Sequence, residues 1–252
     1  MIKKITIIGS GNVATQLSLA FKRANFEIIQ IISRNQKSGE QLAKKINTSF
    51  SNDIKGVLKS DFIIICVNDD NISSVVKKLP DIPVVHTSGN TSIEVLKNKK
   101  IYGVIYPVQS LSKERKINFN NVPVCVEASN RNFEKKLVTI IKKISNHVYI
   151  LDSKSRKYLH LSAVITSNFS NYCYSISKDI LDQKKIDFSL LKPLIIYTAE
   201  KTLYQEPKLN QTGPAKRGDK KTIKEHLEIL DNKNYKNIYK LLSKNILKEY
   251  EK

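Results

Sequence analysis

Two glycines near the start of the chain have the spacing of a loop that binds a dinucleotide. The stretch Gly9-Ser10-Gly11-Asn12-Val13-Ala14 follows an apolar run and opens an amphipathic one. Gly9 would permit a tight turn from strand to helix, and Gly11 would let the backbone approach a pyrophosphate. Amide hydrogens at a helix start, together with the helix dipole, attract such an anion. The residues predicted to contact the diphosphate are Gly9, Ser10, Gly11, Asn12 and Val13.

The residues that end the second predicted strand, 26–33, distinguish between two cofactors. A site for NAD typically has Asp or Glu there, which accepts hydrogen bonds from the 2′-hydroxyl of the ribose. This chain has Ser33 and Arg34 instead. Arg34 can pair with a 2′-phosphate through two hydrogen bonds, and Ser33 can donate another. The pattern favours NADP over NAD, and the alternative is that Arg34 is a solvated loop residue.

Two later predicted strands end in residues that would line the same edge of the sheet. Val67 and Asn68 follow the buried strand that begins at Asp61, and Ser88, Gly89 and Asn90 follow the next strand. Open parallel sheets bind their ligands at the carboxyl ends of the strands. The predicted contacts to the cofactor here are Val67, Asn68, Ser88 and Gly89, and those to the substrate are Ser88 and Asn90.

Polar side chains recur at helical spacing in the long amphipathic segment 155–183. His160, Val164, Ser167, Asn168 and Asn171 are three or four residues apart, so they would share one face of an uninterrupted helix. His160 and Asn168 are the predicted catalytic residues. His160 would donate a proton, because an imidazole titrates near neutral pH, and Asn168 would orient the substrate. Ser167 and Asn171 are predicted to bind the substrate, and purely structural roles for His160 and Asn168 are the alternatives.

A turn-rich loop, 206–220, follows the next predicted helix and contains Gly213, Pro214 and Gly218. Arg217 in this loop could bind a carboxylate or phosphate of the substrate. Asp219 could hold Arg217 in place or cap the helix that begins near Thr222. The alternative is a rigid loop with a purely structural Arg-Asp pair.

The order of the elements predicts an α/β fold. Short apolar runs alternate with amphipathic segments up to about residue 152, which is typical of a Rossmann-type parallel sheet flanked by helices. The rest of the chain is nearly all helical. We therefore predict a Rossmann-type domain in residues 1–152, which binds the dinucleotide, and an all-helical C-terminal domain in residues 153–252, which binds the substrate and forms the dimer.

The composition excludes several other classes of protein. No run of apolar residues is long enough to span a bilayer, and no export signal is evident, so we expect a cytoplasmic protein without a membrane partner. Three cysteines and four histidines lie too far apart for a metal site. The net charge of +20 is spread along the whole chain as short lysine pairs, so nucleic-acid binding is not expected.

Several of these stretches together resemble a known family over nearly the full length of the chain. They are residues 9–14, 86–89, 159–168 and 211–219, of which the last is the most specific. The chain resembles the Rossmann-like proteins whose C-terminal part is domain of unknown function 2520, often assigned as NADP- or coenzyme-F420-dependent oxidoreductases. The resemblance implies a fold related to pyrroline-carboxylate reductase and the β-hydroxyacid dehydrogenases. There a helical second domain covers the nicotinamide and often makes a homodimer.

Two positions depart from the pattern that the resemblance implies. Tyr106 precedes Pro107, where the family pattern has a histidine before the proline. Related β-hydroxyacid dehydrogenases have a lysine one turn before an asparagine on the long helix, and this chain has Val164 there if Asn168 is that asparagine. The usual acid is therefore missing, and His160 is its natural substitute.

Taken together, these residues predict an NADP(H)-dependent oxidoreductase that acts on a small anionic carbonyl or imine. The alternative is a regulatory protein that binds NADP(H) without catalysis, which the departures at Tyr106 and Val164 favour.

Overall fold

The computed structural model describes residues 3–251, which form two compact units. The first unit extends to Ser167, and the second begins at Asn168. The last strand ends before Asp152 and helices follow it, and the contacts divide the chain further on, within the long helical segment.

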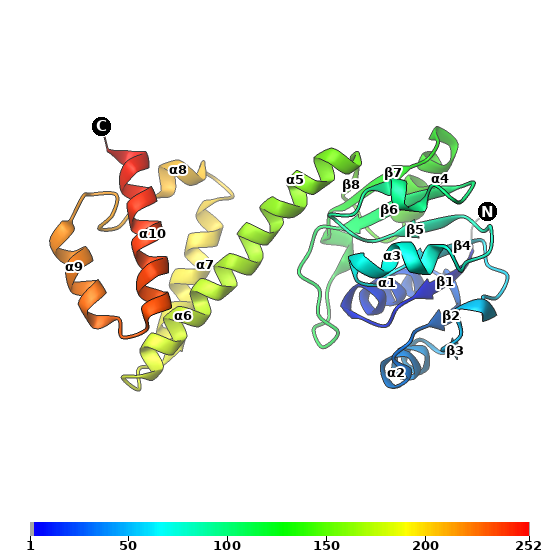
Figure 1. Cartoon of the computed structure of the whole chain (residues 1–252), viewed down its shortest axis with the longest axis horizontal. Helices are drawn as coiled ribbons and strands as arrows, with labels where there is room; N and C mark the ends of the chain where they lie inside the picture. Colours follow the sequence, from blue (N-terminus) through cyan, green and yellow to red (C-terminus); the bar gives the residue numbers. More distant parts are fainter. Residues whose placement is uncertain (1–2, 252) are drawn as a thin grey trace. The chain divides into compact units, whose positions relative to one another are not determined.

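A single eight-stranded sheet forms the centre of the first unit (Figure 1). Its strands, in spatial order, are β3 (Ser49–Ser51), β2 (Glu27–Ile32), β1 (Lys4–Ile8), β4 (Phe62–Ile65), β5 (Val84–His86), β6 (Tyr102–Pro107), β7 (Val124–Ala128) and β8 (Val148–Ile150). The order reverses direction at β1, from which β2 and β4 lie on opposite sides. This reversal is the switch point at which open α/β sheets bind ligands.

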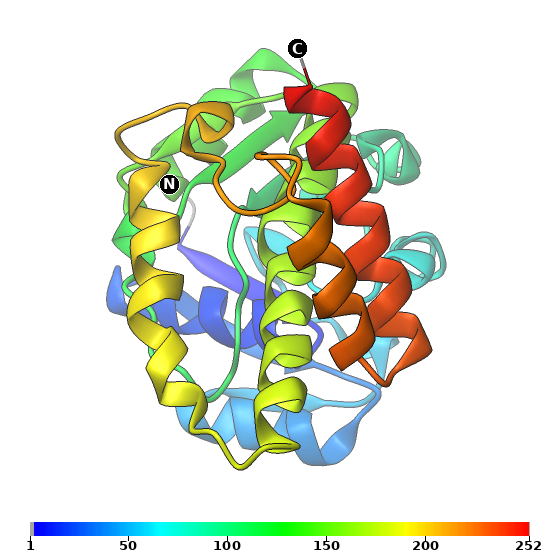
Figure 2. The ribbon, with the colours of Figure 1, turned by 90° about the vertical axis from the view of Figure 1, so that its left-hand side faces the viewer.

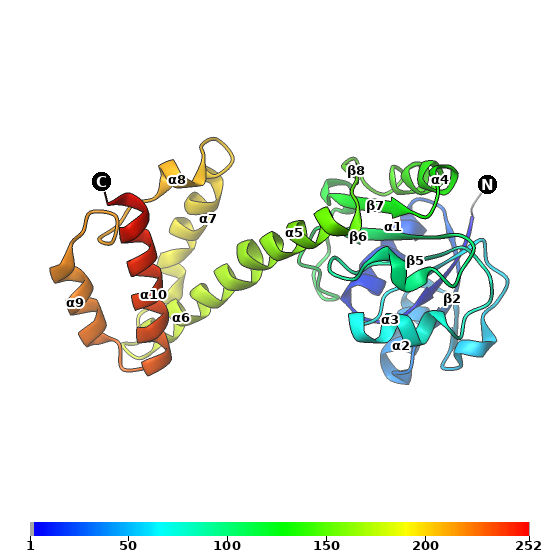
Figure 3. The same cartoon turned by 45° about the horizontal axis from the view of Figure 1, so that its top comes forward.

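Helices cover both faces of this sheet because its strands are apolar on both faces. Helices α1 (Asn12–Arg23), α2 (Gln36–Ile46) and α4 (Arg131–Ile141) contribute to one buried cluster with the sheet residues Ile5 and Ile7. Helix α3 (Asp69–Val76) and the short 3-10 helix η2 (Ile93–Leu96) contribute to a second cluster with Ile63 and Ile65. Figure 3 shows the helices flanking the sheet. The sequence prediction of a Rossmann-type domain is confirmed.

Strand β7 departs from the predicted all-parallel sheet, because it runs antiparallel to β6. A parallel neighbour requires a crossover connection, usually a helix, that returns the chain to the same edge of the sheet. Between β6 and β7 only the one-turn helix η3 (Phe119–Asn121) is present, whereas α4 provides that crossover from β7 to the parallel strand β8. The direction of β7 therefore follows from its connection.

The sequence predicted one continuous α-helix in the long helical segment, but the structure interrupts it. Helix α5 (Ser153–Ala163) passes into a π-helix at Val164–Phe169, and α6 (Ser170–Asp182) follows. A π-helix forms i→i+5 hydrogen bonds, so residues three and four apart within it are no longer aligned as in an α-helix. The predicted shared face of His160, Ser167 and Asn168 assumed α-helical geometry throughout, and that assumption is wrong for residues 164–169.

The second unit consists of helices. Helix α6 is followed by α7 (Lys192–Lys201), the short α8 (Pro207–Asn210), α9 (Lys220–Ile229) and α10 (Lys233–Tyr250). Helices α9 and α10 are joined by a short turn and lie side by side (Figures 1 and 2). In the described residues of both units, no helix is sufficiently long and apolar to cross a lipid bilayer.

Candidate functional site

The turn between β1 and α1 has the geometry that the two glycines predicted. Gly9 adopts a φ of +117°, a conformation that strongly favours glycine, and a Cβ there would lie 2.8 Å from the carbonyl carbon of Cys66. At Gly11 a Cβ would meet nothing within 4 Å. Gly11 is also the N-cap of α1, where no side chain caps the helix and no acidic residue occupies the first turn. The first amides of α1 are thus available to an anion.

A pocket of about 470 Å³ opens beside this turn. The residues predicted from the sequence that line it are Gly9, Ser10, Gly11, Ser33, Arg34, Val67 and Asn68. Asn12, Val13, Ser88 and Gly89, also predicted to contact the cofactor, are not among its lining residues in the described part of the chain. The sequence interpretation missed further lining residues: Asn35, Asn52, Asp53, Asn71, Ser74 and Lys78.

Hydroxyl groups connect the turn between β1 and α1 to the residues that follow β2. The Oγ of Ser10 lies 2.8 Å from the Oγ of Ser33 and 2.6 Å from the Oγ of Ser38. Ser33 is only 8% exposed, so its side chain holds the loop at Ser10, whereas the side chain of Arg34 is exposed at the mouth of the pocket. Asn35 caps α2 by accepting a hydrogen bond from the amide of Ser38.

Lys78 brings a second positive charge to the wall of the pocket that Arg34 also lines. In the sequence it belongs to one of many lysine pairs and has no distinguishing signal. Ile54 and Val75 add apolar surface to the same pocket. Cationic and apolar groups on one pocket suit the 2′-phosphoadenosine part of NADP, which has a phosphate and a flat base.

The rim after β5 is held by hydrogen bonds centred on Ser88. Its Oγ donates to the carboxylate of Asp69 at 2.7 Å and accepts from the amides of Asn90 and Thr91. Its amide donates to Nδ1 of His86 at 3.1 Å. Ser88 is buried, and Asn90 is exposed. Ser88 therefore shapes the loop, while Asn90 stays accessible as a predicted substrate ligand.

His86 is buried completely within this rim. Burial, and secondly the positive charge of Arg156, lower its pKa from 6.5 to about 4. The ring is therefore neutral near pH 7, and its Nδ1 can accept the hydrogen bond from Ser88.

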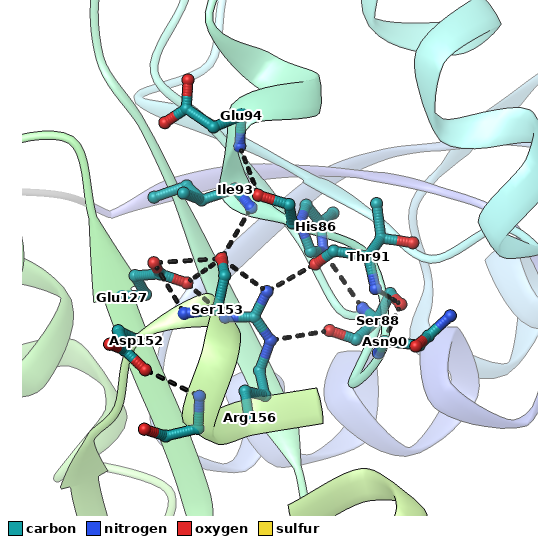
Figure 4. A network of polar contacts seen from close by, with 12 residues as sticks. His86, Ser88, Asn90, Thr91, Ile93, Glu94, Glu127, Asp152, Ser153 and Arg156 are labelled. Carbon is teal, nitrogen blue, oxygen red and sulfur yellow. Dashed lines mark hydrogen bonds and ion pairs between the residues drawn. The ribbon is translucent and has the colours of Figure 1, made fainter. Parts of the chain in front are cut away.

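Arg156 on α5 connects the helix to this rim and to the sheet (Figure 4). Its Nε donates to the carbonyl of Ser88 at 3.2 Å, and its guanidinium also donates to the carbonyl of Thr91 and forms an ion pair with Glu127 on β7. Arg156 is fully buried. Sequence analysis missed this residue, although a charged side chain four residues before His160, about one helical turn, lies on the same face of the helix.

His160 meets Tyr106 from β6. The Oη of Tyr106 lies 3.0 Å from Nδ1 of His160, and the two rings meet edge to face with their centroids 5.7 Å apart. A Cβ at Gly89 would lie 2.7 Å from both that Nδ1 and the ring of Tyr106. Gly89 therefore lets the loop after β5 approach the pair closely.

The remaining predicted residues lie in or beyond the π-helix. Ser167 belongs to the first unit, and Asn168, Asn171 and Arg217 belong to the second. Arg217 is exposed. Asp219 is the N-cap of α9, where it accepts hydrogen bonds from the amide and the hydroxyl of Thr222, which confirms the capping alternative. The predicted substrate contacts of these residues stay predictions.

In residues 3–251 no three His, Cys, Asp or Glu side chains are grouped as metal ligands would be. A groove of about 970 Å³ lies at the opposite, amino ends of the strands, around Lys3 and Asp61. Because open α/β sheets bind ligands at the carboxyl ends, the smaller pocket beside Gly9 is the candidate site.

Comparison with known proteins agrees with this geometry. The family described as NADP oxidoreductase, coenzyme F420-dependent, matches residues 4–88, and domain of unknown function 2520 matches residues 122–246. No curated protein matches the sequence.

Three solved structures illustrate the similarity. A candidate NADP oxidoreductase from Bacteroides fragilis is 36% identical with a TM-score of 0.93, and the match covers 98% of each chain. An imine reductase from Myxococcus stipitatus in complex with NADP+ is 13% identical, with a TM-score of 0.65 over 97% of this chain and 92% of that one. A pyrroline-5-carboxylate reductase from Coxiella burnetii is 16% identical, with a TM-score of 0.58 over 100% of each. The last two show the fold alone.

The glycine turn, the pocket beside it and the similarity to the Bacteroides protein over nearly the whole chain lead to one assignment. The chain belongs to a family of NADP oxidoreductases. In this family, an N-terminal domain of the type described as NADP oxidoreductase, coenzyme F420-dependent, is followed by domain of unknown function 2520.

Proposed function

We propose that the protein is an NADP(H)-dependent oxidoreductase that reduces a small anionic carbonyl or imine. The observation that carries the proposal is the uncapped N-terminus of α1, which follows the turn at Gly9 and lies beside a pocket with two cationic side chains, Arg34 and Lys78. An anion at this helix start would be bound by amides that have no side-chain partner.

The described residues fit the diphosphate and the 2′-phosphate of the dinucleotide. Gly11 leaves open space where a Cβ would otherwise stand, which suits the approach of a diphosphate. Arg34 supplies a planar cation for a 2′-phosphate, and Lys78 adds a point charge to the same pocket. When bound, reduced NADP supplies a hydride; the protein supplies binding, orientation and a proton.

His160 is the proton donor in this proposal. It is half-buried on α5 and pairs with Tyr106, next to the rim formed by the loop after β5. The reduced carbonyl oxygen or imine nitrogen would take its proton from this imidazole. Asn168 stays a predicted catalytic residue, and Ser88, Asn90, Ser167, Asn171 and Arg217 stay predicted substrate ligands.

The substrate class is supported by charge and by similarity of fold. The chain has 43 Lys and Arg against 23 Asp and Glu, and this positive net charge favours anionic substrates. The imine reductase and the pyrroline-5-carboxylate reductase, which share the fold, act on C=N bonds by their names. Residues 1–152 would then serve the cofactor, and residues 153–252 the substrate.

Homodimerisation through the C-terminal helices is part of the proposal. Leu194 and Tyr197 lie three residues apart on α7 and are 59% and 60% exposed, and Leu190, in the 3-10 helix that precedes α7, is 70% exposed. Exposed apolar side chains grouped in this way are typical of an interface. Sedimentation should give a dimer that Leu194→Glu converts to a monomer, and a monomeric wild-type protein would refute this part.

The test of the enzymatic proposal is oxidation of NADPH, followed by the absorbance of the reduced nicotinamide, against a panel of keto acids and cyclic imines. Turnover that His160→Ala reduces by about 100-fold or more is expected. Tight NADPH binding without turnover of any panel member, unchanged in His160→Ala, would instead support the regulatory alternative.

A further inference from the structure

Tyr106 and His160 form a pair that brings three segments of the first unit together. The phenol oxygen of Tyr106, on β6, lies 3.0 Å from Nδ1 of His160, on α5. The peptide of Gly89 closes over both rings, so closely that any Cβ there would clash with them. The pair is therefore fixed from the strand, the helix and the loop after β5.

The environment of Tyr106 decides which partner donates. Its side chain is 8% exposed and packs in a small apolar cluster with Ile93, Val104 and Cys125. Burial raises the pKa of Tyr106; the Cys125 thiol adds to this effect and the charge of Arg156 opposes it. The phenol therefore keeps its proton at neutral pH and can donate it in a hydrogen bond to the unprotonated Nδ1 of a neutral His160 ring.

We propose that Tyr106 is the positioning residue of His160: it binds Nδ1, and so makes Nε2 the atom that delivers the proton to the substrate. This inference rests on the proposed function, because it gives an atom to the proton transfer assigned there to His160.

The proton that the substrate gains comes from His160, and solvent replaces it. In the charged ring, Nδ1–H donates to the phenol oxygen and Nε2 carries the proton to be transferred. His160 Nε2 gives that proton to the oxygen or nitrogen that receives the electron pair of the broken C=O or C=N π bond, while the carbon accepts the hydride. The ring is then neutral, with its remaining proton at Nδ1, which still donates to the phenol oxygen, until solvent reprotonates Nε2.

A phenol suits a proton donor better than a carboxylate would. A carboxylate at Nδ1 stabilises the imidazolium and makes it a weaker acid, whereas a neutral hydroxyl orients the ring without that charge. The charge of Arg156 on α5 opposes the effect of burial on Tyr106, and Arg156 is itself paired with Glu127 on β7. Tyr106 thus provides orientation alone.

Tyr106→Phe tests the inference because it removes only the hydroxyl and retains the ring in its apolar cluster. Tyr102→Phe, on the same strand, is the matched control. The first readout is the ring ¹⁵N spectrum of the protein without cofactor, in which His160→Gln identifies the His160 signals. In its neutral form, wild-type His160 should show one tautomer with the proton at Nε2, Tyr106→Phe should show a mixture, and Tyr102→Phe should match the wild type.

The second readout is turnover with the best substrate of the panel. Tyr106→Phe should lower kcat by about 10-fold to 100-fold, within the range of general-acid effects, with KM and the Kd for NADPH unchanged within about twofold. An unchanged His160 tautomer in Tyr106→Phe, or a changed tautomer with wild-type kcat, would overturn the positioning role. If the wild-type protein binds no NADPH, the proposed function fails by itself, and the ¹⁵N spectra still decide whether Tyr106 sets the His160 tautomer.

Discussion

Gly9 and Cys66 directly follow two neighbouring parallel strands, β1 and β4, and their backbones are packed so closely that a Cβ on Gly9 would lie 2.8 Å from the carbonyl carbon of Cys66. Two residues later, a Cβ on Gly11 would meet nothing within 4 Å. The two glycines of the loop therefore have different roles: Gly9 is needed for folding, and Gly11 leaves room for a ligand.

This difference predicts opposite effects of the same substitution. Gly9→Ala should lower the free energy of unfolding by about 2 kcal/mol or more, because the alanine would be strained at positive φ and would overlap Cys66. Gly11→Ala should leave that free energy within about 0.5 kcal/mol of the wild type but weaken NADP binding by about 10-fold or more, since the methyl group would occupy the space of the diphosphate. Urea unfolding and titration calorimetry measure the two effects. Wild-type NADP affinity in a folded Gly11→Ala protein would contradict the assigned role.

Arg34→Asp tests cofactor preference. Loss of a charge-assisted, bidentate contact and a new repulsion should raise the Kd for NADPH by about 10-fold to 100-fold, with a smaller change for NADH, which lacks the 2′-phosphate. Lys37→Asp, an exposed substitution of the same charge on α2, is the control. Equal losses for NADPH and NADH in Arg34→Asp would rule out the 2′-phosphate contact.

Local pattern was sufficient to predict much of the fold and part of the site. The apolar strand around Ile63 and the glycine loop follow from residues adjacent in the sequence, and both are confirmed. Strand β3 was missed because Ser49-Phe50-Ser51 is short and mostly polar. The direction of β7 depends on a connection without a long helix, which alternation of apolar residues does not reveal.

Residues that act through long-range contacts escaped sequence analysis. Lys78 lines the pocket with Arg34 only because β2 and β4 lie on either side of β1. Arg156 lies in an amphipathic helix, and its burial depends on Glu127, distant in the sequence. The π-helix at Val164–Phe169 interrupts a segment whose side chains suit an ordinary α-helix, so spacing alone gave the wrong geometry there.

The Arg156–Glu127 pair predicts a strong effect of single substitutions. Arg156→Met would remove the donor that now binds the carboxylate of Glu127 and the carbonyls of Ser88 and Thr91. We expect this to lower the free energy of unfolding by about 3–5 kcal/mol. Combining it with Glu127→Met should recover part of that loss, whereas Lys154→Met on the exposed side of α5 should have little effect. Urea unfolding of the wild type, Arg156→Met, Glu127→Met, the double variant and Lys154→Met measures this, and additive losses in the double variant would contradict a coupled pair.

His86 predicts a loss of stability in mild acid. Its pKa is lowered from an ordinary value of 6.5 to about 4 in the folded chain. At a pH between these two values, His86 therefore binds a proton in the unfolded chain but not in the folded chain. Stability from this group is complete above about pH 6.5 and is lost as the pH falls toward about 4, by up to about 3 kcal/mol. His86→Gln should flatten the dependence of the unfolding free energy on pH in this window, and His147→Gln, at an exposed position, should not. The same slope in His86→Gln as in the wild type would exclude His86 as its source.

The most direct test of the account is titration calorimetry of the wild-type protein with NADPH, NADP and NAD. We predict saturable binding of NADPH and NADP with one site in each chain, weaker binding of NAD, and a marked loss in Gly11→Ala. No association of either NADP or NAD at millimolar concentration would contradict the claim that the turn after β1 binds a diphosphate.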